Sequence, residues 1–384
     1  MKIIHTSDWH IGKLVHGLHM TQDQEYILNQ LLEIIESEKP DVLIISGDIY
    51  DRSVPPTEAI KLLDKTLAKI LIEHRCNIIM IAGNHDNPDR LSFASELLKV
   101  QGLYIVSNIE QALNPIIMND EDGEVAFYPI PYLEPSIVKR YYQDEKVKTH
   151  QGALEKILEN LEIDYSKNRR NVAIYHGFVK GFSDVETSES ERQLSIGGSE
   201  VVDVMLFKKF DYVALGHLHG PQKIQLPNIR YAGSLLKYSF SEHLHKKGIL
   251  IIDLKDDDIL INEIKLNPKR NMRRIKGKLE DLIEHAESEG NQDYIEAILT
   301  DRGELIDAIG KLRSVYPNIL SLTRENTYLL QTDNTSASKE FNKMHPTDLF
   351  YEFFENITGE NLPKGSQSII EKTYLEISKE KRRN

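Results

Sequence analysis

The sequence predicts an α/β fold, followed by a smaller α+β unit and a helical tail. Short apolar runs alternate with stretches that repeat apolar residues at helical spacing, which is the pattern of parallel βαβ units. The runs are apolar on both faces, so helices or a second layer should cover both sides of the sheet. Five of these runs end in a polar loop, and ligands collect at the carboxyl ends of parallel strands.

The amino-terminal part alternates strand and helix. Apolar strands are expected at residues 3–4, 42–45 and 78–82. The first intervening helix has the capping-box spacing of Thr21 and Gln24 and ends before Pro40. The second opens at Pro55-Pro56-Thr57, and four of its apolar residues are expected to face the core: Ile60, Leu63, Leu67 and Ile70.

Further strands are expected at residues 125–130, 172–175 and 212–215, with a helix around Leu154 to Leu161. A hairpin, 249–254 and 259–264, turns at the run Asp256-Asp257-Asp258 and closes the first unit. Residues 183–200 are polar and rich in Ser and Glu, which fits either a solvated loop or a loop on the substrate side.

Composition changes after residue 264. A basic stretch comes first: Lys265, Lys269, Arg270, Arg273, Arg274, Lys276 and Lys278. A helix, strand, helix, strand pattern then covers 279–286, 294–299, 305–315 and 319–322. Residues 332–340 resemble a linker. Two helices follow, the first opening at Pro346, and their aromatic stripe must dock on the body or receive a partner helix.

Charge and cysteine content exclude several classes of protein. With 47 basic and 60 acidic side chains the net charge is −13, which argues against a uniformly positive nucleic-acid-coating protein. The single cysteine, Cys76, excludes a disulfide framework and a Cys-based zinc site. There is no apolar targeting region and no apolar run of membrane-spanning length. We therefore expect a soluble cytoplasmic protein without a membrane partner.

The five polar loops supply side chains suited to metal binding. Oxygen and imidazole ligands without thiolate favour manganese, iron or catalytic zinc. Two ions about 3.5 to 4 Å apart can activate water and hold both oxygens of a phosphoester displacement. The number of candidates fits two ions with open positions, so phosphoester hydrolysis is the first hypothesis. The candidate ligands are Asp8, His10, Asp48, Asn84, His176, His217 and His219.

The order of these motifs resembles the calcineurin-like metallophosphoesterase superfamily: Asp8-x-His10, Gly47-Asp48-x-x-Asp51, Gly83-Asn84-His85-Asp86, His176 and Gly216-His217-x-His219. The flanking residues, and the run Ser239-Phe240-Ser241-Glu242, are similar to its bacterial DNA-nuclease branch, whose members carry aspartate at the position of Asp51. The resemblance implies a four-layer αββα sandwich with a small α+β capping domain and a C-terminal two-helix tail. It places the domains at 1–268, 269–331 and 332–384.

The resemblance also implies roles for individual residues. Asp8, His10, Asp48 and His219 would hold one Mn²⁺, and Asp48 would bridge to a second held by Asn84, His176 and His217. His85 would be the catalytic group beside the scissile phosphate, and Asp86 would orient it. The implied partners are DNA, an SMC-family ATPase gripped by the tail, and a second copy of the chain, giving a homodimer and a heterotetramer.

Two alternatives remain open from the sequence. A metallophosphatase or cyclic-nucleotide phosphodiesterase would use the same ligands on small substrates. The basic stretch 265–278 and the residues after the catalytic body favour DNA. A non-catalytic scaffold should have lost ligands, whereas every candidate ligand and His85 are present.

Overall fold

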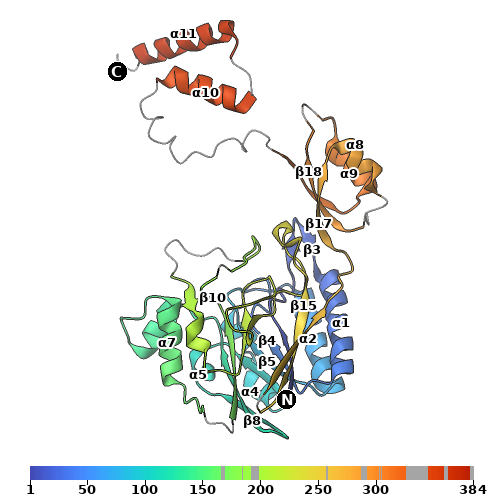
Figure 1. Ribbon diagram of the computed structural model, residues 1–384, viewed down its shortest axis with the longest axis vertical. Coiled ribbons are helices and arrows are strands. Elements are labelled where there is room, and N and C mark those ends of the chain that lie inside the picture. The colour runs from blue at the N-terminus through green and yellow to red at the C-terminus, as the bar shows by residue number, and fades with distance from the viewer. Residues whose placement is uncertain are drawn as a thin grey trace.

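The computed structural model describes residues 1–165, 169–183, 185–191, 199–256, 258–286, 292–301, 303, 305–325, 345–358 and 362–380. Its body contains two six-stranded sheets (Figure 1). The first has the order β16-β15-β1-β4-β5-β6, with β1, β4, β5 and β6 parallel. Its strands are β1 (Lys2–Thr6), β4 (Val42–Ile45), β5 (Asn77–Ile81), β6 (Leu103–Val106), β15 (Gly248–Leu254) and β16 (Ile259–Lys265).

The second sheet has the order β13-β14-β12-β9-β8-β7, with β8, β9, β12 and β14 parallel and an antiparallel strand at each edge. Its strands are β7 (Ile116–Asp120), β8 (Gly123–Ile130), β9 (Arg169–His176), β12 (Tyr212–Gly216), β13 (Gln222–Lys223) and β14 (Ile229–Tyr231). The five strands that end in polar loops thus divide between the sheets, β1, β4 and β5 in one and β9 and β12 in the other.

Helices cover the outer face of each sheet, and Figure 1 shows α1 and α2 on the opposite side of the body from α7. A continuous apolar core lies between the sheets, where Ile44 and Ile79 belong to the same cluster as Val172 and Ile174. The four-layer αββα prediction is therefore confirmed. The helices of the body are α1 (Thr21–Glu38), α2 (Thr57–Ala68), α3 (Pro88–Leu91), α4 (Ser95–Lys99), α5 (Ile109–Ala112), α6 (Pro135–Tyr142) and α7 (His150–Asn160).

Two local expectations for α1 and α2 were wrong. Met20, not Thr21, precedes α1, and no side chain caps the helix. Gln24 instead accepts the Gly12 N–H at 3.0 Å and donates to the His10 carbonyl at 2.7 Å, so its amide braces the loop after β1. In α2, Ile60 is 47% exposed, because the buried stripe of this helix runs through residues 59, 62, 63, 66 and 67.

Two short strand pairs complete the body. Strands β2 (Leu14–Val15) and β3 (Leu18–His19) are antiparallel, and β10 (Phe178–Lys180) pairs in parallel with β11 (Val201–Asp203). A 3₁₀ turn at Val204–Phe207 follows β11, and a second, Phe240–Glu242, lies just before β15. In the described part of the chain, no helix is both long and apolar enough to cross a membrane.

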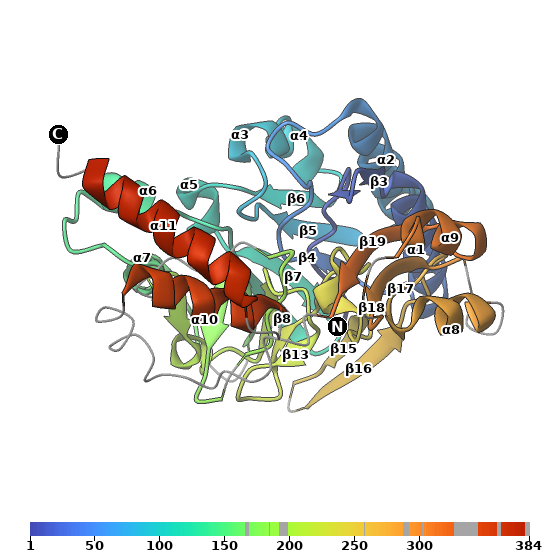
Figure 2. The same ribbon diagram turned by 90° about the horizontal axis from the view of Figure 1, so that it is seen from above.

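The small unit after β16 is a three-stranded parallel sheet with two helices (Figure 2). Its strands and helices are β17 (Met272–Gly277), α8 (Leu279–Glu284), β18 (Tyr294–Leu299), α9 (Ala308–Val315) and β19 (Ile319–Arg324). The sequence pattern missed β17, which lies inside the basic stretch.

The cations of that basic stretch are largely used within the protein. Arg273 pairs with Asp293 at 2.7 Å, Arg274 pairs with Glu296, and Lys276 pairs with Glu325. Arg270 reaches across to Asp23 of α1 at 3.3 Å. The stretch therefore forms a sheet strand and its ion pairs, which weakens its interpretation as a free basic surface for DNA.

The tail consists of α10 (Pro346–Thr358) and α11 (Lys364–Glu380). The helices touch where the Tyr351 hydroxyl donates to the Gln367 carbonyl at 3.3 Å. Large apolar side chains remain exposed on both helices: Phe350, Phe353 and Ile369 are 42%, 58% and 66% exposed. The expected linker at 332–340 and the Ile377 side chain lie outside what the structure describes.

Candidate metal centre

The two sheets bring their polar loops together at one edge of the sandwich. β1, β4 and β5 deliver residues 8–10, 48 and 84–86, while β9 ends at His176 and β12 leads to His217 and His219. In the second sheet, Gly216 is the register partner of His176, so these two loops start side by side. All seven predicted ligands lie in this one region, although 209 positions separate His10 from its neighbour His219.

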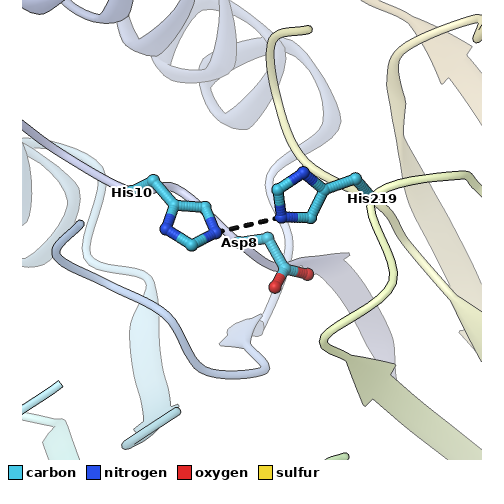
Figure 3. Close-up of side chains that lie close together, drawn as sticks. All are labelled: Asp8, His10 and His219. Carbon is cyan, nitrogen blue, oxygen red and sulfur yellow. Dashed lines mark hydrogen bonds between the residues drawn. The ribbon is translucent and has the colours of Figure 1, made fainter. Parts of the chain in front are cut away.

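Asp8, His10 and His219 form the first cluster, and Figure 3 shows the rings of His10 and His219 facing each other with the Asp8 carboxylate below them. The Nε2 atoms of His10 and His219 are 3.0 Å apart. One ligand atom from each residue lies within 4.8 Å of the others, and none of the three side chains is more than 1% exposed. Buried donors that converge in this way suit a cation.

Asp48 lies between this cluster and a second one. Its Oδ2 is 3.6 Å from His10 Nε2 and 3.4 Å from His176 Nε2. Asp8, Asp48 and His176 also form a group with ligand atoms within 4.8 Å. One carboxylate thus faces histidines from both sheets, which is the position of a bridging ligand.

Asn84, His176 and His217 form the second cluster. Asn84 Oδ1 is 3.1 Å from His176 Nε2 and 3.0 Å from His217 Nδ1. His176 Nδ1 lies 2.7 Å from the Ser46 carbonyl, to which it must donate its hydrogen. In neutral His176, Nε2 then presents a lone pair to the Asn84 oxygen, and a proton or a cation between the two atoms would relieve that contact. The residues therefore fit a second ion.

The pKa values of these side chains reflect two opposing effects: burial, which disfavours a charged group, and the opposite charges that lie nearby. Burial alone would lower the pKa of His176, but the Asp48 and Asp8 carboxylates and the Ser46 carbonyl together outweigh it and raise that pKa to about 9. Burial and the nearby His176 lower the pKa of His217 to about 3. Burial opposes ionisation of Asp48, yet His176 and His10 hold its pKa well below the usual range. Protonated His176 thus supplies the positive charge that a metal ion would replace.

The backbone at the candidate ligands is strained. Asp8, His10 and Asp48 have φ values of 53°, 44° and 49°, and His217 has 110°. Side-chain-bearing residues seldom adopt positive φ, and each such residue costs on the order of 1 to 3 kcal/mol. The surrounding loops hold the strain: the His10 N–H donates to the Asp48 carbonyl at 2.9 Å, and the His217 N–H lies 3.1 Å from both oxygens of Asp8.

Three motif glycines allow the loops to approach closely. A Cβ at Gly83 would lie 2.8 Å from Asp48 Cγ and nearer still to Asp48 Oδ1. A Cβ at Gly216 would lie 2.9 Å from the Ser46 carbonyl carbon and nearer still to its oxygen. Gly47 similarly faces the His176 ring. At Gly83 the glycine is needed for space, not for a positive φ.

His85 stands beside the first cluster without joining the two groups around Asp48. Its Nδ1 lies 2.8 Å from the Asp51 carbonyl, so Nδ1 carries the hydrogen and Nε2 is left for other partners. Its ring packs edge-on against His10 with centroids 4.8 Å apart. Asp51 also pairs with Lys13 at 2.8 Å and approaches His10 Nδ1 at 3.8 Å. Asp51 thus orients His85 through its backbone.

Asp86 has a different role from the one the sequence suggested. Its carboxylate accepts the backbone N–H groups of Ile49, Tyr50 and Gly83 at 3.0, 2.9 and 2.9 Å. These bonds tie the loop after β4 to the loop after β5. Burial, with the charge of Asp48, raises the pKa of Asp86 to about 7. The structure therefore gives Asp86 a bracing role, and the group that orients His85 is the Asp51 carbonyl.

Sequence reasoning missed the residues that lie behind His219. Glu242 and Lys247 form a buried ion pair, and Glu242 Oε1 is 3.2 Å from His219 Nδ1. Glu191 Oε1 accepts the His219 N–H at 2.7 Å. Glu242 belongs to the run Ser239-Phe240-Ser241-Glu242, which carries part of the family resemblance, but neither its charge nor its spacing indicated that it would face a ligand.

Two known families match this chain. Residues 1–221 match the calcineurin-like phosphoesterase family, and residues 268–358 match a family described as the type 5 capsule protein repressor C-terminal domain. Among solved structures, a dimetal phosphatase from Danio rerio aligns with a TM-score of 0.43 and 12% identity, over 70% of this chain and 98% of that one.

Two staphylococcal proteins match almost end to end. The SbcD subunit of the nuclease SbcCD from Staphylococcus epidermidis is 39% identical over 365 residues, covering 94% of this chain and 95% of the relative. The protein of the same description from Staphylococcus saprophyticus is 36% identical over 381 residues, covering 99% of both. The chain therefore belongs to the calcineurin-like phosphoesterase family and, within it, to the family of the SbcD subunits of the nuclease SbcCD.

Proposed function

We propose that this chain is the nuclease subunit of an SbcCD-type complex. It acts as a manganese-dependent double-strand 3′–5′ exonuclease and single-strand or hairpin endonuclease in DNA recombination, replication and repair. Family membership supports nuclease activity. The observation that supports the two-metal mechanism is Asp48, whose Oδ2 faces His10 of one cluster and His176 of the other at 3.6 and 3.4 Å.

The proposed ligand sets follow the two clusters. Asp8, His10, Asp48 and His219 hold the first ion, and Asp48 with Asn84, His176 and His217 holds the second. Two divalent ions would lower the pKa of a bound water and neutralise charge on the attacking and leaving oxygens of a phosphodiester. Nitrogen and oxygen donors without thiolate are compatible with Mn²⁺.

His85 is the proposed catalytic residue. The Asp51 carbonyl fixes the Nδ1 hydrogen, and this leaves Nε2 as the ring nitrogen that can act on the substrate. When Nε2 also carries a proton, the His85 imidazolium can donate a hydrogen bond to a non-bridging phosphate oxygen or give that proton to the leaving oxygen. Asp86 supports the reaction indirectly, by holding the Asn84 loop against the Asp48 loop.

The experiment that tests this function compares His85→Ala with Asp48→Ala. His85→Ala should bind two Mn²⁺ ions but lose cleavage of linear duplex DNA, whereas Asp48→Ala should lose both. Wild-type cleavage by the His85→Ala protein would refute the mechanism. The same assay separates the alternative function, because a metallophosphatase or cyclic-nucleotide phosphodiesterase would hydrolyse small phosphoesters and leave DNA intact.

We further propose three functional parts: a nuclease domain at 1–268, a DNA-capping domain at 269–331, and a linker with a partner-binding tail at 332–384. The partner is an SbcC-like SMC-family ATPase, whose apolar surface would cover the exposed Phe350, Phe353 and Ile369. Truncation after residue 335 should abolish binding of that ATPase while intrinsic Mn²⁺-dependent cleavage persists. Unchanged affinity for the ATPase would contradict the assignment of the tail.

A second copy of the chain is the proposed occupant of an apolar groove beside α2, α3 and α4. The groove has a volume of about 770 Å³ and is lined by Ile60, Ile72 and Phe93, which are 47%, 76% and 81% exposed. Burying such side chains favours association. The resulting homodimer would join two ATPase subunits in an SbcC₂D₂ heterotetramer, working on DNA in the cytoplasm. A monomer in sedimentation equilibrium at micromolar concentration would contradict the homodimer.

A further inference from the structure

The described part of the polar loop that the sequence left unassigned lies behind His219, one of the proposed metal ligands. We call its described residues 185–191 the strap. The strap contacts His219 at two points: Glu191 Oε1 accepts the His219 backbone N–H at 2.7 Å, and Ser190 Oγ lies 2.7 Å from His219 Nδ1. The strap therefore reaches both the backbone and the ring of a proposed metal ligand.

The strap meets a second support from the 3₁₀ turn before β15. Glu242, which has no exposed surface, faces His219 Nδ1 at 3.2 Å and also accepts a hydrogen bond from Ser190 Oγ. Lys247 pairs with the other oxygen of Glu242 and donates to the His219 carbonyl at 2.8 Å. His219 is thus held at its N–H, its carbonyl and its Nδ1, and only Nε2 is left to face His10.

The strap is itself held in place by hydrogen bonds, so it can keep His219 in position. The Glu191 carboxylate accepts the backbone N–H and the hydroxyl of Ser188 at 2.9 and 3.0 Å. The Glu189 N–H donates to Ser241 Oγ at 3.0 Å, and the Gln222 side chain exchanges two hydrogen bonds with the backbone of Glu186. These contacts join the strap to β13 and to the turn that carries Glu242.

Among the described residues, the contacts of the strap go to the first cluster. Its side chains touch His219, whereas the second-cluster ligand His176 is oriented by the Ser46 carbonyl. A histidine that donates its other ring nitrogen to a carboxylate or hydroxyl is a better-oriented and more basic metal ligand. Loss of the strap contacts should therefore weaken the first ion and spare the second.

We propose that Ser190 and Glu191 are positioning residues, which together with Glu242 fix the tautomer and direction of His219 for the first metal ion. The inference rests on the proposed ligand sets. It gives the strap a function on the metal side, where the sequence left a choice between a solvated loop and a substrate-side loop.

The test uses the full-length chain and four variants on one loop. Ser190→Ala and Glu191→Ala remove the two contacts to His219. Glu189→Ala is the matched control, because Glu189 lies on the same strap with an exposed side chain and uses only its backbone N–H. Mn²⁺ binding is measured by calorimetry, and the ion pair by the spin-coupled signal in electron paramagnetic resonance. Thermal unfolding without metal monitors the fold.

We expect Ser190→Ala and Glu191→Ala to bind one Mn²⁺ ion with unchanged affinity and the other about 10- to 100-fold more weakly. The spin-coupled signal should be replaced by that of a single ion at low Mn²⁺. Glu191→Gln, which keeps an acceptor for the His219 N–H, should recover most of the affinity, and Glu189→Ala should match the wild type.

Two results would overturn the inference alone: wild-type affinity for both ions in Ser190→Ala and Glu191→Ala, or an equal loss at both ions. The second result would mean that the strap supports the whole fold and not one ligand. A wild-type chain that binds fewer than two ions would overturn the proposed function itself, and the strap inference would fall with it.

Discussion

Replacing Gly83 by alanine should break the metal centre although no proposed ligand is itself replaced. The added Cβ would lie 2.8 Å from Asp48 Cγ, whereas carbon atoms pack at about 3.5 to 4.0 Å. Asp48 or the loop after β5 must therefore move by roughly 0.7 Å or more, and Asp48 faces both clusters. Overpacking of this kind costs about 1 to 3 kcal/mol of unfolding free energy.

Function should suffer more than stability in this variant. A displacement of about 1 Å at a catalytic site can cost about 100-fold in rate, so we expect at least that loss of DNA cleavage and weaker binding of both ions. Chemical denaturation, Mn²⁺ calorimetry and a duplex-cleavage assay measure the three effects.

Gly152→Ala is the matched control for this substitution. Gly152 lies in α7, and a Cβ there meets Thr149 Oγ1 at an ordinary 3.5 Å. Alanine in a helix should be neutral or stabilising by about 0.5 to 1 kcal/mol, and cleavage should be unchanged. If Gly83→Ala binds two ions and cleaves DNA like the wild type, the close approach of Gly83 to Asp48 does not govern the site.

Two further predictions concern protons and metal. The charge on His176 stabilises the metal-free fold below pH 6.5, and this stabilisation should be lost as pH rises through about 9. Mn²⁺ binding at pH 7.5 should therefore release a proton, and the affinity for Mn²⁺ should rise toward pH 9. Calorimetry in buffers of different ionisation enthalpy measures the number of protons released. Binding without proton release would contradict the prediction. Chelation should lower the Tm, because ions at about 100 times Kd stabilise the fold by about 2.7 kcal/mol. A Tm that does not change when Mn²⁺ is added or removed would mean that the buried clusters hold no ion.

The sequence was informative about the site because local patterns specify it. Buried strands read as apolar runs, and the polar residues at their ends must lie at a sheet edge, so the amino-acid pattern alone could place Asp8, Asp48 and His176 together. The division of these strands between two sheets could not be read, since strand pairing depends on tertiary contacts that leave no local pattern.

Other details failed for related reasons. Gln24 fits a capping box by spacing, but its amide forms hydrogen bonds with the backbone of the loop after β1. Asp86 follows His85 directly, yet its acceptors face backbone N–H groups that lie up to 37 positions away. β17 was hidden because its Arg side chains, which look solvated in sequence, pair with acidic residues in β18 and just before it.

The division of the ligands between two sheets has a consequence during synthesis. Asp8 and Asp48 leave the ribosome early, whereas His217 and His219 follow β12 and emerge only after more than half of the chain. A nascent chain that ends before β12 should therefore bind Mn²⁺ weakly and leave DNA intact, which a stalled-ribosome fragment can test. A fragment of that length that binds Mn²⁺ tightly and cleaves DNA would contradict this expectation. Because the site is assembled from both sheets, an incomplete chain should have no nuclease activity.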